Sequence, residues 1–345
     1  MSVKVDYDQL LTNPAPHLHR GQLMSDAMKD VIIALIPVTL TSLIIFQWDA
    51  VIILVVTLLG ALLGESVGRN LKGESSRLSD GSAFLTGLLL ALTLPPTAWY
   101  AMVPLYFMGG FLATAVFREL LGGGLGKNRF NPALAARIFL LAGRTALVYM
   151  APLILMVSEF FRPYLDELGA IDAMAKATPL MKLSMGEALP SNLEFIFIYE
   201  GGSLAETSVL AVLIGALYLI YKNHIKWYLP LSILTTVFIV SAIAGQDPFF
   251  HVLAGGLLFG SFFMATDWVT SPVSGKGQVI FGICIGLLVV FFRLLVERLW
   301  IGTGGVAFSI IIMNYFVPYI DRMTIRSKFG ASKKRAVKGK QEATG

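Results

Sequence analysis

The chain has 345 residues, of which 56% are hydrophobic and only 14% are charged. Soluble domains carry about 25% charged residues, so this composition excludes a soluble globular protein and indicates a polytopic membrane protein. The formal net charge of +5 comes from basic residues in short links and in the tail, a distribution that orients membrane helices and requires no nucleic-acid partner.

A transmembrane helix needs about 20 apolar residues, and on this rule the sequence predicts about ten spans. They follow a polar N-terminal segment, residues 1–23. The predicted spans are residues 24–46, 50–68, 83–94, 99–117, 133–157, 207–221, 227–244, 249–265, 278–299 and 304–320. The third is too short to cross a membrane and stops at Pro95. The sequence therefore predicts an all-α fold that includes short half-helices.

Basic residues fall in alternate links, and this alternation predicts the orientation. One set of links holds Arg69, Arg118, Lys127 and Lys222, and the basic tail at residues 321–345 belongs to the same set. We expect this set and both termini to be cytoplasmic. A long polar loop, residues 158–206, is then expected to be extracytoplasmic, where its acidic residues are permitted.

The two halves, residues 24–157 and 207–320, repeat one pattern of five spans. A short glycine-containing segment at residues 83–95 has a counterpart at residues 251–267. In each half a full span and a glycine cluster follow. An odd number of spans per half means that the second copy is inverted, and inverted repeats with interrupted helices place binding sites near the midplane.

Few residues stand out as candidates for chemistry. One thiol, Cys284, can hold neither an iron–sulfur cluster nor an internal disulfide, so any bound electron carrier is expected to be organic. The four histidines have no metal-ligand spacing, and no metal site is predicted. Arg144 either carries a function within its span or reaches an interface where the helix breaks at Gly143. Arg293 is expected to extend towards the membrane surface or to pair with Glu297.

The polar loop contains the pattern D-x-x-x-x-A-T-P-L, formed by Asp172, Ala177, Thr178, Pro179 and Leu180. By residue type alone the pattern indicates an ordinary exposed turn, with Thr178 extended before the proline. The pattern resembles the flavin-attachment loop of the NqrB/RnfD family, membrane subunits of Rnf and Na⁺-translocating quinone reductase complexes. The resemblance implies that a flavin transferase joins FMN through its phosphate to the Thr178 hydroxyl.

Other stretches resemble the same family, and one pair of residues departs from it. The family's Ser-Gly before Ala-Thr is replaced by Ala175 and Lys176. The further matches are residues 80–89, 130–133, 201–203, 206–208, 263–267 and 270–272. The resemblance also implies a non-covalent riboflavin near the half-helices. The candidate binding residues there are Asn131, Thr86, Thr266, Asp267 and Ser271, with Asp267 either a structural cap or part of an ion path.

Together these features predict an electron-transfer subunit of an Rnf-type ferredoxin:NAD⁺ oxidoreductase in a prokaryotic inner membrane. The resemblance implies partner subunits that carry flavin and iron–sulfur clusters, and coupling to Na⁺ or H⁺ movement. Two alternatives remain: an NqrB-like quinone reductase subunit, and a passive channel of the urea or ammonium type. A channel has no use for a flavin-attachment loop.

Overall fold

The computed structural model describes residues 24–75, 78–96, 102–143, 179–180, 183, 191–199, 201–296 and 305–324. Every regular element within these ranges is a helix, which agrees with the predicted all-α class. Two helices, Asp26–Leu71 and Gly275–Leu294, are long and apolar enough to cross a membrane. The ten-span inverted layout stays a prediction.

The first half is built around α2 (Met24–Leu71), which reverses direction at Gln47, where φ is 45°. Its two arms match the predicted spans at residues 24–46 and 50–68. The rest of this half is short: η1 (Leu78–Asp80), α3 (Ser82–Leu92), α4 (Val103–Phe111), the π-helical η2 (Leu112–Leu120) and a helix at Pro132–Gly143. The α3 helix has only 11 residues, as the sequence predicted for a half-helix.

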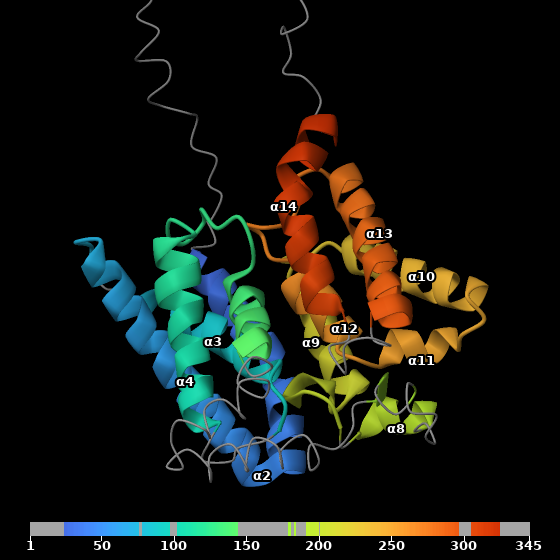
Figure 1. The fold of residues 1–345 in the computed structure, drawn as a ribbon, viewed down its shortest axis with the longest axis horizontal. Coiled ribbons are helices and arrows are strands. Elements are labelled where there is room, and N and C mark those ends of the chain that lie inside the picture. The colour runs from blue at the N-terminus through green and yellow to red at the C-terminus, as the bar shows by residue number, and fades with distance from the viewer. Residues whose placement is uncertain are drawn as a thin grey trace, which may run out of the picture.

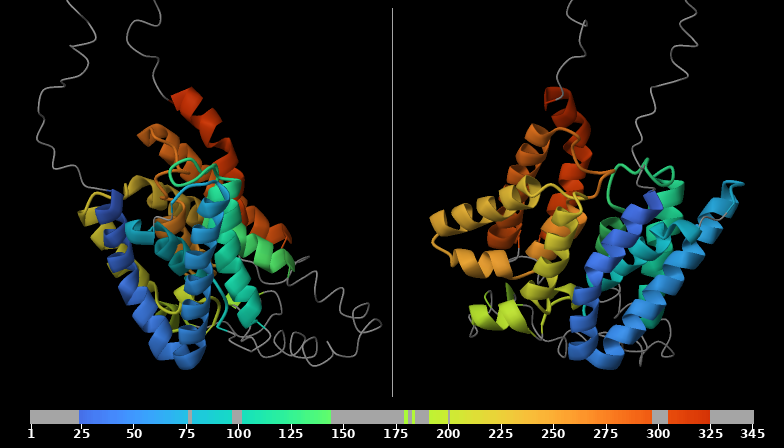
Figure 2. Two further views of the ribbon diagram at one scale, coloured as in Figure 1. Left: turned by 90° about the vertical axis from the view of Figure 1, so that its left-hand side faces the viewer. Right: turned by 180° about the vertical axis from the view of Figure 1, so that it is seen from behind.

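The second half lies beside the first, as Figures 1 and 2 show. It contains α8 (Asn192–Phe197), η4 (Leu204–Glu206), α9 (Val209–Tyr221), α10 (Tyr228–Ile243), α11 (Pro248–Leu253), α12 (Leu257–Phe259), the π-helical η5 (Gly260–Met264), α13 (Gly275–Phe291), the π-helical η6 (Phe292–Val296) and α14 (Val306–Thr324). The predicted span at residues 249–265 is interrupted after α11. Gly255 and Gly256 adopt φ values of 70° and 65° there, a conformation that glycine adopts without steric cost.

Glycines bring the helices close together. A Cβ on Gly110 of α4 would overlap the Thr57 carbonyl oxygen of α2. A Cβ on Gly282 of α13 would similarly overlap Ser232 of α10. Membrane helices associate through such small-residue contacts because apolar burial drives little association in lipid. The two halves therefore use the same packing device, and they meet where Gly215 of α9 contacts the backbone of Ala34 in α2.

Candidate functional site: a cavity between the two halves

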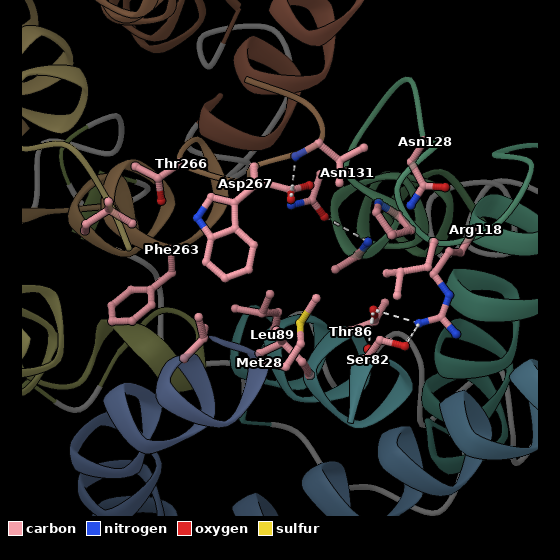
Figure 3. Close-up of a pocket in the computed structure, with 18 of the residues that line it drawn as sticks. Met28, Ser82, Thr86, Leu89, Arg118, Asn128, Asn131, Phe263, Thr266 and Asp267 are labelled. Atoms are coloured by element: carbon pink, nitrogen blue, oxygen red, sulfur yellow. Dashed lines mark hydrogen bonds between the residues drawn. The ribbon is translucent and has the colours of Figure 1, made fainter. Parts of the chain in front are cut away.

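A cavity lies between the two halves of the described part of the chain. Its volume is about 100 Å³, which is smaller than the range of about 300–1,000 Å³ typical of small-molecule sites. Figure 3 shows its side chains coming from both halves of the chain. Four of the predicted binding residues line it, namely Thr86, Asn131, Thr266 and Asp267. The structure therefore brings together residues separated by up to 181 positions (267 minus 86).

The two predicted threonines present acceptors rather than donors to the cavity. The Thr86 hydroxyl donates to the Ser82 carbonyl at 2.9 Å, and the Thr266 hydroxyl donates to the Phe262 carbonyl at 2.6 Å. Each hydroxyl proton is thus used within its own helical segment. A ligand that accepts hydrogen bonds must find its donors elsewhere in the lining.

Asn131 begins the Pro132–Gly143 helix and also touches the other half. Its side-chain oxygen accepts hydrogen bonds from the backbone amides of Ala133 and Leu134, at 3.0 and 3.3 Å. This is the geometry of a helix N-cap. The side-chain amide nitrogen of Asn131 donates to the Met264 carbonyl at 3.5 Å. The side chain thus joins the end of η5 to the start of a helix in the first half.

Asp267 has the geometry of a structural cap. One carboxylate oxygen accepts from the Val269 amide at 3.3 Å and the other from the Thr270 hydroxyl at 3.1 Å. Burial raises the pKa of this carboxyl, while both hydrogen bonds favour its charged form. The fifth candidate, Ser271, is buried but does not line the cavity. Its backbone amide donates to the Asp267 carbonyl at 3.0 Å.

Arg118 is a cavity residue that the sequence predicted to lie in a cytoplasmic link. Its side chain is only 1% exposed because it lies in η2, within the helical bundle. One nitrogen lies 2.5 Å from the Glu65 carboxylate, and another donates to the hydroxyls of Ser82 and Thr86 at 3.2 and 3.5 Å. An ionisable pair at helix depth is a functional signal, and Glu65 within a predicted span offered that signal.

A polar network beside the cavity connects α2 to the C-terminal end of α9. Asp30 accepts from the Tyr218 hydroxyl and contacts His224, both at 2.7 Å. The backbone carbonyl of His224 in turn accepts from the Trp268 indole at 2.7 Å. Trp268 lines the cavity, so these contacts connect an aromatic side chain of the site to Asp30 in the first half through His224 in the second.

Away from this cavity, the break between α11 and α12 lies against the end of the flavin-loop motif. The Leu180 side chain packs against Gly255, where the Arg293 guanidinium also lies. Arg293 is buried and donates to the carbonyls of His251 and Ala254, the latter at 2.9 Å. The expectation that Arg293 reaches the membrane surface is therefore wrong, because its donors satisfy the end of α11.

Glu206 lies at the same break, with its carboxylate against Gly202 and Gly256. The Ser203 hydroxyl donates to it at 2.8 Å. Burial raises the pKa of the Glu206 carboxyl, although Arg137 and the Ser203 hydroxyl favour its charged form. The break thus gathers an acid and two arginines from separate segments.

The remaining predicted residues fall outside the described residues. These are Asp172, Ala177, Thr178 and Arg144. Of the flavin-loop motif, only Pro179 and Leu180 are described, and Leu180 is 2% exposed.

The sequence matches the NQR2, RnfD, RnfE family over residues 11–330. The chain is 36% identical to the D subunit of the Na⁺-translocating ferredoxin:NAD⁺ oxidoreductase complex of Acetobacterium woodii, over 94% of this chain and 96% of that protein. It is 34% identical to the D subunit of the proton-translocating ferredoxin:NAD⁺ oxidoreductase complex of Clostridium ljungdahlii, over 92% and 95%. The D subunit of an ion-translocating oxidoreductase complex of Stutzerimonas stutzeri is 38% identical, over 88% and 91%. The chain belongs to the NQR2, RnfD, RnfE family.

Proposed function

We propose that this chain is the membrane-embedded, flavin-carrying D subunit of an Rnf-type ion-translocating ferredoxin:NAD⁺ oxidoreductase. The observation that carries the proposal is the match to D subunits over nearly the whole chain. Ferredoxin and NAD⁺ bind to other subunits of the complex, including flavin-bearing and iron–sulfur subunits. This subunit passes electrons between its partners within an inner membrane.

FMN is joined to the Thr178 hydroxyl by a flavin transferase, through a phosphoester. The support is the motif of Asp172 and residues 177–180 together with the packing of Leu180 on Gly255. Thr178 directly precedes Pro179 and Leu180 in the sequence. The proposed attachment therefore places the flavin next in the chain to the Leu180 contact, on the extracytoplasmic side.

A second, non-covalent flavin, riboflavin, is proposed at the central cavity, which has to widen from about 100 Å³ to admit the ring. A flavin needs aromatic or apolar faces, polar partners for its pyrimidine ring, and shelter from water. The cavity offers Phe263, Trp268, Met28 and Leu89 as faces, and Arg118 as a charged donor. When bound, the flavin supplies reversible one-electron and two-electron transfer. The protein residues hold and orient the ring and exclude solvent from it.

The proposed coupling of electron transfer to ion movement uses the predicted scaffold of ten spans, in which the two halves are inverted relative to each other. Both halves contribute to the cavity and both contain a short helix next to a buried arginine, which supports this layout. The relatives are named for Na⁺ in one case and for protons in the other, at 36% and 34% identity. The coupling ion of this chain is proposed to be Na⁺ or H⁺.

The covalent assignment is tested on a denaturing gel. Full-length chain isolated from its native complex is expected to give a fluorescent band, and Thr178→Val is expected to abolish the fluorescence. Ser184→Ala, which removes a hydroxyl from the same loop, is the matched control and is expected to keep it. Fluorescence that persists in Thr178→Val would refute the attachment site. A chain free of flavin that conducts a solute in liposomes would favour a passive channel.

A further inference from the structure

A side-chain contact joins the two walls of the central cavity. Met28 of α2 lines the cavity from the first half, and Ile225 and Trp268 line it from the second. Asp30 follows Met28 by two residues, and His224 directly precedes Ile225. The Asp30 carboxylate contacts the Nε2 atom of His224 at 2.7 Å. This contact therefore connects the segments that form the two walls.

The carboxylate of Asp30 has further partners besides His224. The Tyr218 hydroxyl donates to its other oxygen at 2.7 Å, and the Lys222 amine lies 3.8 Å from that same oxygen. The side chains of His224 and Asp30 are 5% and 15% exposed. Histidine is the side chain whose charge ordinarily changes between about pH 5 and 8. Asp30 therefore keeps a donor and a cation when the imidazole is neutral, and the imidazole charge is the variable part of the network.

The other charged groups nearby are engaged elsewhere or exposed. Asp26 and Lys29, one turn earlier on α2, pair with each other at 3.4 Å. Asp267, which precedes Trp268, accepts hydrogen bonds from its own loop. Lys226 is exposed. Asp30 is therefore the acid that contacts the His224 imidazole.

A positive charge on His224 strengthens two contacts at once. A hydrogen bond between charged partners is about twice as strong as one between neutral groups, so protonation strengthens the contact with Asp30. The ring of His224 also lies 5.7 Å from the Trp268 ring, centroid to centroid, within the reach of about 6 Å of a cation–π interaction. Protonation therefore tightens the connection between Asp30 in one wall and Trp268 in the other.

We propose that His224 is a pH-sensitive clamp on the central cavity. At low pH the imidazolium pairs with Asp30 and lies against Trp268, and these contacts hold the two walls together. At high pH the neutral imidazole makes a weaker hydrogen bond, and the walls separate more often. In the predicted orientation the link that holds Lys222 faces the cytoplasm, so the clamp responds to the pH of that side. The inference does not depend on a ligand in the cavity.

The test measures how often the cavity opens, in full-length chain carrying Cys284→Ser and Ala133→Cys in lipid nanodiscs. Ala133 lines the cavity and is 1% exposed, so a small methanethiosulfonate reagent reaches this position when the walls separate. Each variant is compared with the parent at the same pH, which cancels the ionisation of the reporter thiol. Asp30→Asn is expected to raise the labelling rate about tenfold at pH 6 and about threefold at pH 8.

Two further variants separate charge from shape. His224→Gln keeps a donor that cannot gain a charge, so it is expected to label about threefold faster than the parent at pH 6 and at the parent rate at pH 8. Asp26→Asn removes an exposed acid from the same helix and is expected to keep the parent rate at both pH values.

Two results would overturn the clamp. An Asp30→Asn rate equal to that of the parent at both pH values would mean that the contact does not hold the walls together. An equal increase at both pH values would mean that the contact is structural and independent of the imidazole charge. If Ala133→Cys does not fold, Thr266→Cys, which also replaces a residue that lines the cavity, is expected to give the same ratios.

Discussion

Arg118 and Arg293 occupy similar positions in their two halves, and each donates hydrogen bonds to a short helix of its own half. Each lies in a π-helical segment, is at most 4% exposed, and donates to the short helices of its own half. Arg118 contacts the hydroxyls of Ser82 and Thr86 in α3, whereas Arg293 contacts the carbonyls at the end of α11. This recurrence is what the predicted repeat of the two halves leads us to expect. Their different partners indicate different roles.

Arg293 is expected to be structural, so Arg293→Met should destabilise the protein strongly. The substitution leaves the carbonyls of His251 and Ala254 without these donors, at a cost of roughly 2–5 kcal/mol in unfolding free energy. Thermal unfolding of the purified chain in detergent measures the effect. The matched control is Arg322→Met, which removes an exposed arginine from α14. Equal stability of the two variants would contradict this role.

Close helix packing predicts a contrast between two glycines. Gly110→Ala makes a Cβ overlap the Thr57 carbonyl oxygen, so the helices must separate, with an expected loss of about 1–3 kcal/mol. Among the residues that the structure describes, a Cβ on Gly143 meets nothing within 4 Å, and Gly143→Ala is expected to be neutral or slightly stabilising, since alanine favours helix. Chemical unfolding in detergent compares them. A tolerated Gly110→Ala would show that α2 and α4 are not closely packed.

The Asp30–His224 contact is expected to couple α2 to α9. A double-mutant cycle with Asp30→Asn and His224→Gln should give a coupling energy of about 0.5–3 kcal/mol. The control cycle uses Asp26 and Lys29, an exposed pair at 3.4 Å, and is expected to give less than about 1 kcal/mol. Independent effects of Asp30→Asn and His224→Gln would mean that the network does not hold the two helices together.

If the non-covalent flavin lies in the central cavity, it can be removed without loss of the covalent flavin. Ala133 lines the cavity and is 1% exposed, so Ala133→Phe should fill ligand space and reduce non-covalent flavin. Covalent flavin, measured by gel fluorescence, is expected to be unchanged. Leu217→Phe alters a residue of α9 that is 64% exposed and serves as the control. Full non-covalent flavin in Ala133→Phe would exclude this cavity as the site.

Sequence patterns predicted the elements of this fold better than its contacts. The half-helix at α3 and the start at Asn131-Pro132 follow from local signals, since proline and asparagine act within a turn of the chain. The burial of Arg118 could not be predicted in the same way. A charged residue just after an apolar run usually ends a span, and only its partner Glu65, 53 positions earlier (118 minus 65), reveals otherwise.

The cavity shows the same limit. Thr86, Asn131 and Thr266 belong to separate sequence motifs, and their convergence depends on how the halves pack. The hydrogen bonds of the two threonines also depend on the fold, because each hydroxyl proton is donated within its own helical turn. The interruption at residues 254–256 depends on positive φ values at Gly255 and Gly256. Two glycines in an apolar run permit these values, but they equally permit a continuous helix.

The intact mass of the full-length chain, isolated from its native complex, tests the covalent attachment of FMN most directly. We expect a mass excess equal to FMN less one water, and peptide mapping is expected to locate this excess on Thr178. An unmodified mass, or the same excess on another residue, would contradict the proposed attachment.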